Sequence, residues 1–276
     1  MKIGVMEVPP FTLVFLRVGL AALILFFLLK IQGRKFLSFR HYFKHFFVMG
    51  VMSCALPFTL LTYSEKTISS SLAGLINGCV PIFATTFAHF LFPSDRLNPQ
   101  KVIGIFLGIV GLAFVFIPSL EDGFGNTSGI IMVVIASIGY AGGMVYSKKH
   151  LQGLPPLIAP VWQLIVASCI TLPLCLVLER PFALPFPSWN AIAAIIGLAL
   201  IGSALAFILY YRIIEMAGAS YLSLCTLLFP LIALSLGAFF LGETLTWNAY
   251  VGGAFILSGL GIATELVKRK KIHEIA

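Results

Sequence analysis

The stretch VPPFTLVFLR at residues 8–17 returns in similar form as LPPLIAPVWQ at residues 154–163. Each copy opens an apolar run with two prolines and places a polar side chain, Arg17 or Gln163, eight residues after the first proline. Proline is well tolerated in the first turn of a helix, where its missing N–H has no intrahelical partner to lose. Both stretches are therefore predicted to begin a helix, and the repetition points to an internal duplication.

The composition predicts an all-α polytopic membrane protein. The chain of 276 residues is 59% hydrophobic and only 10% charged, whereas soluble domains carry about 25% charged residues. Continuous apolar runs favour helices over the alternating pattern of a membrane barrel, since lipid cannot satisfy backbone polar groups. The runs are long enough to span a bilayer and lie at about 11–30, 45–63, 72–92, 102–119, 129–147, 157–178, 190–210, 221–241 and 248–267.

The net charge of +8 is a topology signal and not a sign of nucleic-acid binding. When the predicted spans alternate across the membrane, fourteen of the eighteen Lys and Arg residues fall on one side. Basic loops concentrate in the cytoplasm. We therefore expect a cell (inner or plasma) membrane protein with a cytoplasmic C-terminus and an extracytoplasmic loop at 121–128.

The duplication extends beyond the paired prolines. Gly104 and Gly111 recur as Gly252 and Gly259 at an offset of 148, and the loops DRLN (95–98) and ETLT (243–246) also correspond. Internal repeats are typical of membrane transporters. The sequence predicts a first repeat at 1–120, the loop at 121–128, and a second repeat with the basic tail at 129–276.

The two repeats differ at their beginnings. A complete apolar span precedes Pro155, whereas only MKIGVMEV precedes Pro9. This difference predicts two inverted five-helix repeats, of which nine transmembrane helices are visible because the first helix is missing. Five helices per repeat would invert the second copy, in agreement with the charge pattern.

With its double prolines, mid-helix prolines and the closing segment GETLTWNAYVGGAFILSGLGI (242–262), the chain resembles the drug/metabolite transporter superfamily. Within this superfamily it is similar to the EamA-type permeases of ten helices. The resemblance implies a permease that moves amino acids or related small metabolites by alternating access between the two repeats, with export as the favoured direction.

Transporter sites are expected where helices are interrupted near the bilayer midplane. Pro81 and Pro230 are the hinge candidates, because proline removes a backbone donor and kinks a helix. Asn77 and Thr226, each four residues before a proline, could line a substrate cavity or cap carbonyls freed by the prolines. Val80 and Phe229 immediately precede the prolines, and the resemblance implies that they shape the cavity.

Further substrate-binding candidates are polar or amphipathic side chains in the spans. Tyr63 and Tyr211 end equivalent spans, where tyrosine also acts as a simple interfacial anchor. Tyr140 lies deeper, and Trp162 with Gln163 lies about eight residues into its span. Arg17 is the only charge well inside a span. It could orient an anionic group or carboxylate, or it could have a structural role in which it snorkels toward the interface.

Several functions lack sequence support. The five cysteines show no metal-ligand spacing, and no phosphate-binding glycine loop or paired carboxylates occur. We expect no catalytic residues, no metal and no cofactor. Because no acidic residue falls at mid-membrane, facilitated diffusion or exchange is favoured over proton coupling.

The expected partners are a small-molecule substrate and the lipid bilayer, without nucleic acid, and a homodimer is compatible with the sequence. The favoured interpretation is thus a permease that is not an enzyme. The alternatives are a non-transporting membrane subunit and a membrane-embedded lipid-modifying enzyme.

Overall fold

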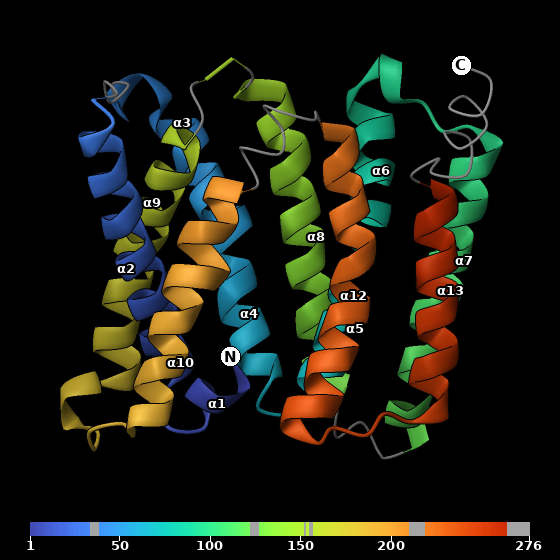
Figure 1. Ribbon diagram of the computed structural model, residues 1–276. Helices are drawn as coiled ribbons and strands as arrows, with labels where there is room; N and C mark the ends of the chain where they lie inside the picture. The colour runs from blue at the N-terminus through green and yellow to red at the C-terminus, as the bar shows by residue number, and fades with distance from the viewer. Residues whose placement is uncertain (34–38, 122–126, 152, 155–156, 210–218, 264–276) are drawn as a thin grey trace. The chain divides into compact units, whose positions relative to one another are not determined.

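The computed structural model describes the chain except for residues 34–38, 122–126, 152, 155–156, 210–218 and 264–276, and except for the side chains at 39–41, 94, 118–121 and 219–227. The regular secondary structure of the described residues is entirely helical. Within each part of the chain, the long helices in Figure 1 lie roughly parallel or antiparallel to one another. The predicted all-α class is confirmed.

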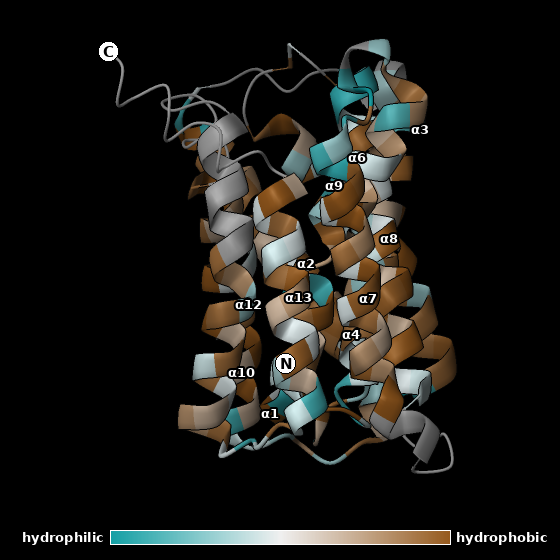
Figure 2. Cartoon of the chain, turned by 90° about the vertical axis from the view of Figure 1, so that its right-hand side faces the viewer, coloured by the Kyte–Doolittle hydropathy of each residue, from teal (hydrophilic) through white to brown (hydrophobic). Residues whose placement is uncertain are grey.

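Each predicted span is mainly helical where the structure describes it, and the span at 72–92 is interrupted at residues 78–79. Seven helical segments are long and apolar enough to cross a membrane: Pro10–Ile31, Tyr42–Ser64, Ser70–Leu91, Pro99–Ile117, Thr127–His150, Ile158–Glu179 and Trp189–Leu209. The described parts of the last two spans are shorter apolar helices, Leu228–Leu241 and Trp247–Ala263. Figure 2 shows hydrophobic residues along the helices and hydrophilic ones mainly near their ends.

The chain forms two compact units that do not follow the predicted repeats. Unit 1 contains Met1–Lys66 and Tyr146–Ala219, and unit 2 contains Thr67–Val145 and Ser220–Ala276. Each unit therefore takes segments from both predicted repeats. The repeats at 1–120 and 129–276 stay a prediction about the sequence, and packing divides the chain differently.

Unit 1 is built around α2 and α9, which lie side by side. Three of its helices contain or end in a π-turn, a wider turn with i→i+5 hydrogen bonding. Its elements are α1 (Lys2–Val5), α2 (Pro10–Ile31), α3 (Phe39–Gly50), the π-turn η1 (Val51–Ala55), α4 (Leu56–Ser64), α9 (Ile158–Leu174), the π-turn η3 (Cys175–Glu179), the 3₁₀ turn η4 (Pro181–Ala183), α10 (Trp189–Ala199) and the π-turn η5 (Leu200–Leu205).

Unit 2 is built around α7 and α13, the most extensively packed pair of helices in the structure. The boundary between the two units falls inside α8, after Val145. The elements of unit 2 are α5 (Ser70–Asn77), α6 (Val80–Leu91), the 3₁₀ turn η2 (Pro93–Asp95), α7 (Pro99–Glu121), α8 (Thr127–His150), α12 (Ala219–Leu241) and α13 (Trp247–Ala263).

Glycines bring the backbones of α7 and α13 together. A Cβ atom added at Gly104 would lie 2.5 Å from the carbonyl oxygen of Gly259, and one at Gly259 would lie 2.5 Å from that of Gly104. Gly111 and Gly252 meet in the same reciprocal way, at 2.5 and 2.6 Å. Repeat-equivalent glycines thus exchange partners, as an inverted pair of helices requires. Small residues of this kind let the backbones of membrane helices approach closely.

Three carboxylates bind the beginnings of helices that are distant in sequence. Glu179 accepts hydrogen bonds from the backbone N–H groups of Phe11 and Thr12 at 2.8 and 2.7 Å, and from the Thr12 hydroxyl at 2.7 Å. These N–H groups have no partner within α2, and a negative charge is favourable at a helix N-terminus. Glu179 therefore ties the end of η3 to the start of α2.

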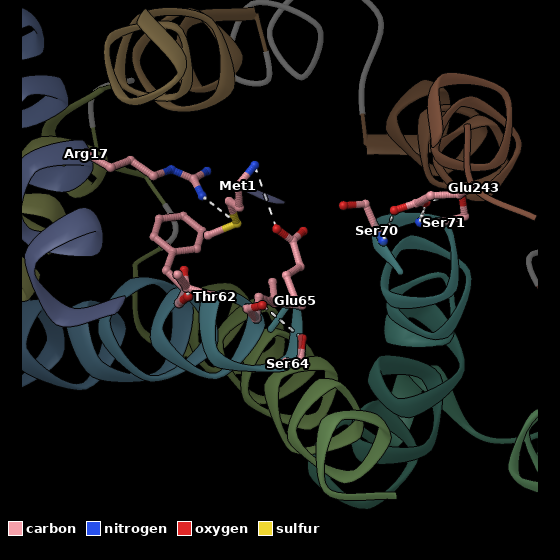
Figure 3. A network of polar contacts seen from close by, with 10 residues as sticks. Met1, Arg17, Thr62, Ser64, Glu65, Ser70, Ser71 and Glu243 are labelled. Atoms are coloured by element: carbon pink, nitrogen blue, oxygen red, sulfur yellow. Dashed lines mark hydrogen bonds and ion pairs between the residues drawn. The ribbon is translucent and has the colours of Figure 1, made fainter. Parts of the chain in front are cut away.

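Glu243 makes the same arrangement in unit 2. Its carboxylate accepts from the N–H groups of Ser70 and Ser71 at 2.8 Å each, and from the Ser71 hydroxyl at 2.7 Å (Figure 3). Glu7 accepts from the N–H and hydroxyl of Ser188, the N-cap of α10, both at 2.6 Å. The hydroxyl of Ser188, and then its N–H, lower the pKa of the exposed Glu7 carboxyl.

Candidate functional site

The predicted interruption at Pro81 is present in unit 2. Helix α5 ends at Asn77 and α6 begins at Val80, with Pro81 in its first turn. A proline there loses no intrahelical bond, so the chain restarts as a helix directly after the break. A discontinuous membrane helix is a common place for a transporter site.

Pro230 does not interrupt its helix. It lies inside α12, which runs without a break from Ala219 to Leu241. Its ring is buried against the break in the other helix, since a Cβ added at Gly78 would lie 2.5 Å from Pro230 Cγ. The symmetric interruption expected from the sequence is therefore found in only one half. Neighbouring helices can compensate a proline inside a membrane helix, which explains why α12 continues.

Asn77 is held at the break by α8. The Ser137 hydroxyl donates to Asn77 Oδ1 at 3.3 Å and to the Val133 carbonyl at 2.9 Å. Tyr140 lies three residues after Ser137, so the two project from one face of α8. Ser137 was not among the sequence candidates. A hydroxyl inside the predicted span 129–147 was the signal that could have identified it.

The remaining candidates of unit 2 have different environments. Val80 and Pro81 are half-buried beside the break, and Tyr140 is also half-buried. Phe229, next to Pro230, is 53% exposed. The side chain of Thr226 lies outside the described residues. Unit 2 thus collects Asn77, Val80, Pro81, Tyr140, Phe229 and Pro230.

Arg17 is buried in unit 1, with 7% of its surface exposed. Its Nε donates to Ser203 Oγ at 2.9 Å, and its Nη2 donates to the Gly202 carbonyl at 3.2 Å. The guanidinium carbon lies 3.9 Å from the centroid of the Phe58 ring, a cation–π distance. Arg17 therefore joins α2 to η5 and α4, and the alternative that it snorkels to the interface is not what the structure shows.

The other edge of the guanidinium points toward Met1 and Glu65. Nη1 lies 3.6 Å from Met1 Sδ, and the Met1 amino group lies 3.8 Å from Glu65 Oε2. Figure 3 shows Arg17 and Glu65 directed toward Met1 from two sides. Glu65 is 8% exposed at the end of α4. A buried cation and a buried anion therefore flank one small region of unit 1. Glu65 was not among the sequence candidates.

Tyr63 and Trp162 pack against other aromatic rings. The ring of Tyr63 meets Phe11 edge to face at 5.7 Å between centroids, and Lys66 Nζ lies 5.4 Å from its centroid. Trp162 stacks on Phe46 at 6.0 Å. Tyr211 lies outside the described residues.

Gln163 differs from its aromatic neighbour. It is 3% exposed, and its Oε1 has no hydrogen-bond partner among the described residues. A buried amide oxygen without a partner costs about 1–3 kcal/mol. Gln163 thus stays a candidate for a polar ligand in unit 1, as the sequence suggested.

The described part of the chain contains no candidate metal site. No cluster of three or more His, Cys, Asp or Glu side chains has metal-binding geometry there. Polar side chains with little exposure lie instead within or at the end of the apolar spans: Arg17, Glu65 and Gln163 in unit 1 and, half-buried, Asn77 in unit 2.

Comparisons with known proteins agree with the all-α membrane fold. The sequence profile of the EamA-like transporter family matches residues 1–117 and 127–264. A transporter of Bacillus subtilis named YoaV is 25% identical over 99% of this chain and 93% of its own length. Protein PecM of Dickeya dadantii is 27% identical over 83% of this chain and 77% of its own.

Two further similarities cover most of the molecule. The inner membrane transporter YedA of Escherichia coli K12 is 25% identical over 89% of this chain and 78% of its own length. A protein of known crystal structure superposes with a TM-score of 0.66 at 19% identity, covering 95% of this chain and 89% of its own, which supports the fold alone. Because the family profile covers nearly all of a polytopic helical membrane protein, the chain belongs to the EamA-like transporter family.

Proposed function

We propose that this transporter moves an amino acid or a closely related metabolite out of the cell by alternating access. The observation that carries the proposal is that Arg17 and Glu65 both contact Met1, so that a buried cation and a buried anion lie on two sides of one small region of unit 1. An amino acid carries a carboxylate and an ammonium group a few ångströms apart. A guanidinium suits the first group and a carboxylate suits the second.

The setting of Arg17 supports a binding role. At 1.5 Å per residue it lies about 10 Å along α2 from Pro10, which places it within the apolar part of the span. A charge at that depth interacts strongly because little water screens it. Phe58, which covers one face of the guanidinium at 3.9 Å, lowers the local polarity further.

Unit 2 supplies a second region of polar side chains in a span. The break between α5 and α6 places Asn77 beside Ser137, and Tyr140 follows one turn later on α8. We propose that these groups also contact substrate during transport. Pro81 is the proposed hinge, since its helix is already divided at that point. Pro230 is proposed to pack against the break between α5 and α6 and not to act as a hinge of α12.

Alternating access was expected to move one repeat against the other. Because each compact unit draws on both predicted repeats, we propose that the units are the moving bodies. The close backbone contacts of α7 with α13 support this choice, since such a pair is too tightly packed to separate.

Reconstitution tests the proposal. The purified full chain in liposomes is assayed for exchange of each L-amino acid in radiolabelled form, beside its C-terminal amide and its decarboxylated amine. We expect transport of at least one amino acid and weak transport of the matched amide and amine. Efflux and uptake are measured separately to test the direction.

Three variants sharpen the assay. Arg17→Gln and Glu65→Gln each remove one charge, and Arg180→Gln is the matched control, since Arg180 is exposed after η3. A hydrogen bond to a charged group contributes about 1.5–3 kcal/mol. We therefore expect roughly a tenfold or larger rise in KM for the first two variants and none for the control. No flux of any compound would favour a non-transporting membrane subunit.

The orientation is part of the proposal. We propose that the basic loops and the C-terminus face the cytoplasm, which follows from the distribution of Lys and Arg. A reporter protein that works only in the cytoplasm should be active when it is fused after residue 150 or after residue 276. A reporter that works only outside the cytoplasm should be active when it is inserted in the 121–128 loop.

A further inference from the structure

The π-turns η1 and η5 occupy equivalent places in the two predicted repeats. An offset of 149 maps Val51–Ala55 onto residues 200–204, and η5 covers Leu200–Leu205. The same offset pairs Cys54 with Ser203. Such turns are rare, and they occur frequently at functional sites. Both turns belong to unit 1, the unit that contains Arg17.

The hydrogen bonding of η5 explains how it binds Arg17. In a regular α-helix the N–H of residue 206 would bond to the carbonyl of residue 202. Here the N–H of Ala206 bonds instead to the carbonyls of Ile201 and Ser203. The Gly202 carbonyl is released from the helical ladder and accepts from Arg17 Nη2 at 3.2 Å.

Ser203 supplies the second contact. Its hydroxyl, on a residue that is 1% exposed, accepts from Arg17 Nε at 2.9 Å. Nε and Nη2 form one edge of the planar guanidinium, so two consecutive residues of η5 bind one edge together. The Phe58 ring covers one face. Together these contacts direct Nη1 toward Met1 and the side of Glu65.

We infer that Ser203, with the Gly202 carbonyl released by η5, positions Arg17 to receive the carboxylate of a transported amino acid. This inference rests on the proposed function. Arg17 is the group that contacts substrate, and Ser203 acts through it. Without the Ser203 hydroxyl the guanidinium can rotate about its side-chain bonds, and its carboxylate-binding edge is no longer held in one direction.

The test compares amino acids with their amides in the full chain. Ser203→Ala removes the hydroxyl, Ser203→Thr keeps it, and Cys54→Ala is the matched control at the equivalent position of η1. Initial rates of L-amino acids and their C-terminal amides are measured in proteoliposomes. We expect Ser203→Ala to raise KM for the amino acid roughly tenfold with little change in Vmax.

The amide separates positioning from a general effect on structure. KM for the amide should be the same in wild type and Ser203→Ala, because the amide carries no carboxylate for Arg17. Ser203→Thr should restore the wild-type preference, and Cys54→Ala should retain it. An equal loss of rate for amino acid and amide in Ser203→Ala would overturn the inference, since it indicates a purely structural role.

Two outcomes distinguish this inference from the proposed function. Carboxylate preference that is lost in Arg17→Gln but kept in Ser203→Ala overturns only the positioning role. Absence of carboxylate preference in the wild type overturns the proposed function itself.

Hydrogen exchange adds a readout without substrate. Amides of residues 200–206 should exchange faster in Arg17→Gln than in wild type, and unchanged exchange would contradict the contact between Arg17 and η5.

Discussion

The two compact units join segments of both repeats by different chemistry. In unit 2, α7 and α13 approach so closely at Gly104, Gly111, Gly252 and Gly259 that no side chain fits between their backbones. In unit 1, segments from the two repeats meet through polar groups. Arg17, a buried charge, binds η5, whereas the contact of Glu179 with the start of α2 has its counterpart in unit 2 at Glu243.

The difference indicates a division of roles. Close van der Waals packing between backbones has few alternative arrangements and favours a rigid scaffold. Polar contacts across apolar helices are costly to break but can be exchanged for equivalent contacts with a polar ligand. This contrast fits the proposal that unit 1 recognises the substrate, with the α7–α13 pair as a rigid support.

The largest effect is expected from filling the glycine contact of unit 2. In Gly252→Ala, the new Cβ would lie 2.6 Å from the Gly111 carbonyl oxygen and 2.8 Å from Val115 Cγ2. The helices would have to separate, and overpacking of this kind costs about 3 kcal/mol. Thermal unfolding in detergent micelles measures the loss.

Gly261→Ala is the matched control in the same helix, because a Cβ there meets no atom within 4 Å. It should be neutral or stabilising by up to about 1 kcal/mol, since alanine favours a helix more than glycine does. Equal stability of both variants would show that the backbones of α7 and α13 do not touch, and the contrast between the units would disappear.

The next effect concerns the carboxylates that both units share. Glu179→Ala and Glu243→Ala each remove bonds to two backbone N–H groups and one hydroxyl. We expect each to lower the stability by about 2 kcal/mol. The Gln variants retain an acceptor oxygen and should lose less. A large loss of stability for only one of the two Ala variants would mean that the two contacts contribute differently to stability despite their similar geometry.

A smaller effect is expected at the two prolines. Pro230→Ala removes a buried ring that packs against Gly78, so a stability loss of about 1 kcal/mol is expected from the cavity. Pro81→Ala changes a first-turn position and should alter the stability by less than about 0.5 kcal/mol. If Pro81 is a hinge, its variant should instead lower the transport rate. A larger stability loss for Pro81→Ala than for Pro230→Ala would contradict the finding that the helix is interrupted at Pro81 but not at Pro230.

The smallest effect is a pH dependence at the exposed contact of Glu7 with Ser188. Since the contact lowers the pKa of Glu7 in the folded protein, its stabilisation is present above the unfolded pKa of about 4.3. It is lost as the pH falls through the lower folded value. Glu7→Gln should therefore narrow the gap in melting temperature between pH 7 and pH 3. An identical gap in wild type and variant would show that the contact has no effect on stability.

The sequence predicted the fold class and the nine apolar segments because bilayer thickness and backbone hydrogen bonding leave few choices to an apolar run. It also predicted the break at Pro81 and showed the recurrence of glycines at an offset of 148. These features depend on local composition and on the repeat. The equivalent break at Pro230 was not found, because the environment of that proline comes from Gly78, a residue more than 150 positions away in the chain.

The candidate site was only partly predictable for the same reason. Arg17, Gln163 and Asn77 could be recognised as polar groups inside apolar spans, since membranes make such groups costly. The partners of Arg17, which are Ser203 and Phe58, and the partner of Asn77, which is Ser137, could not be identified, because those contacts join different helices. The sequence by itself determined which segments cross the membrane and which side chains are unusual there. Tertiary structure decided which segments form each unit and where a π-turn releases a carbonyl for Arg17, because packing between distant helices leaves no periodic signal along the chain.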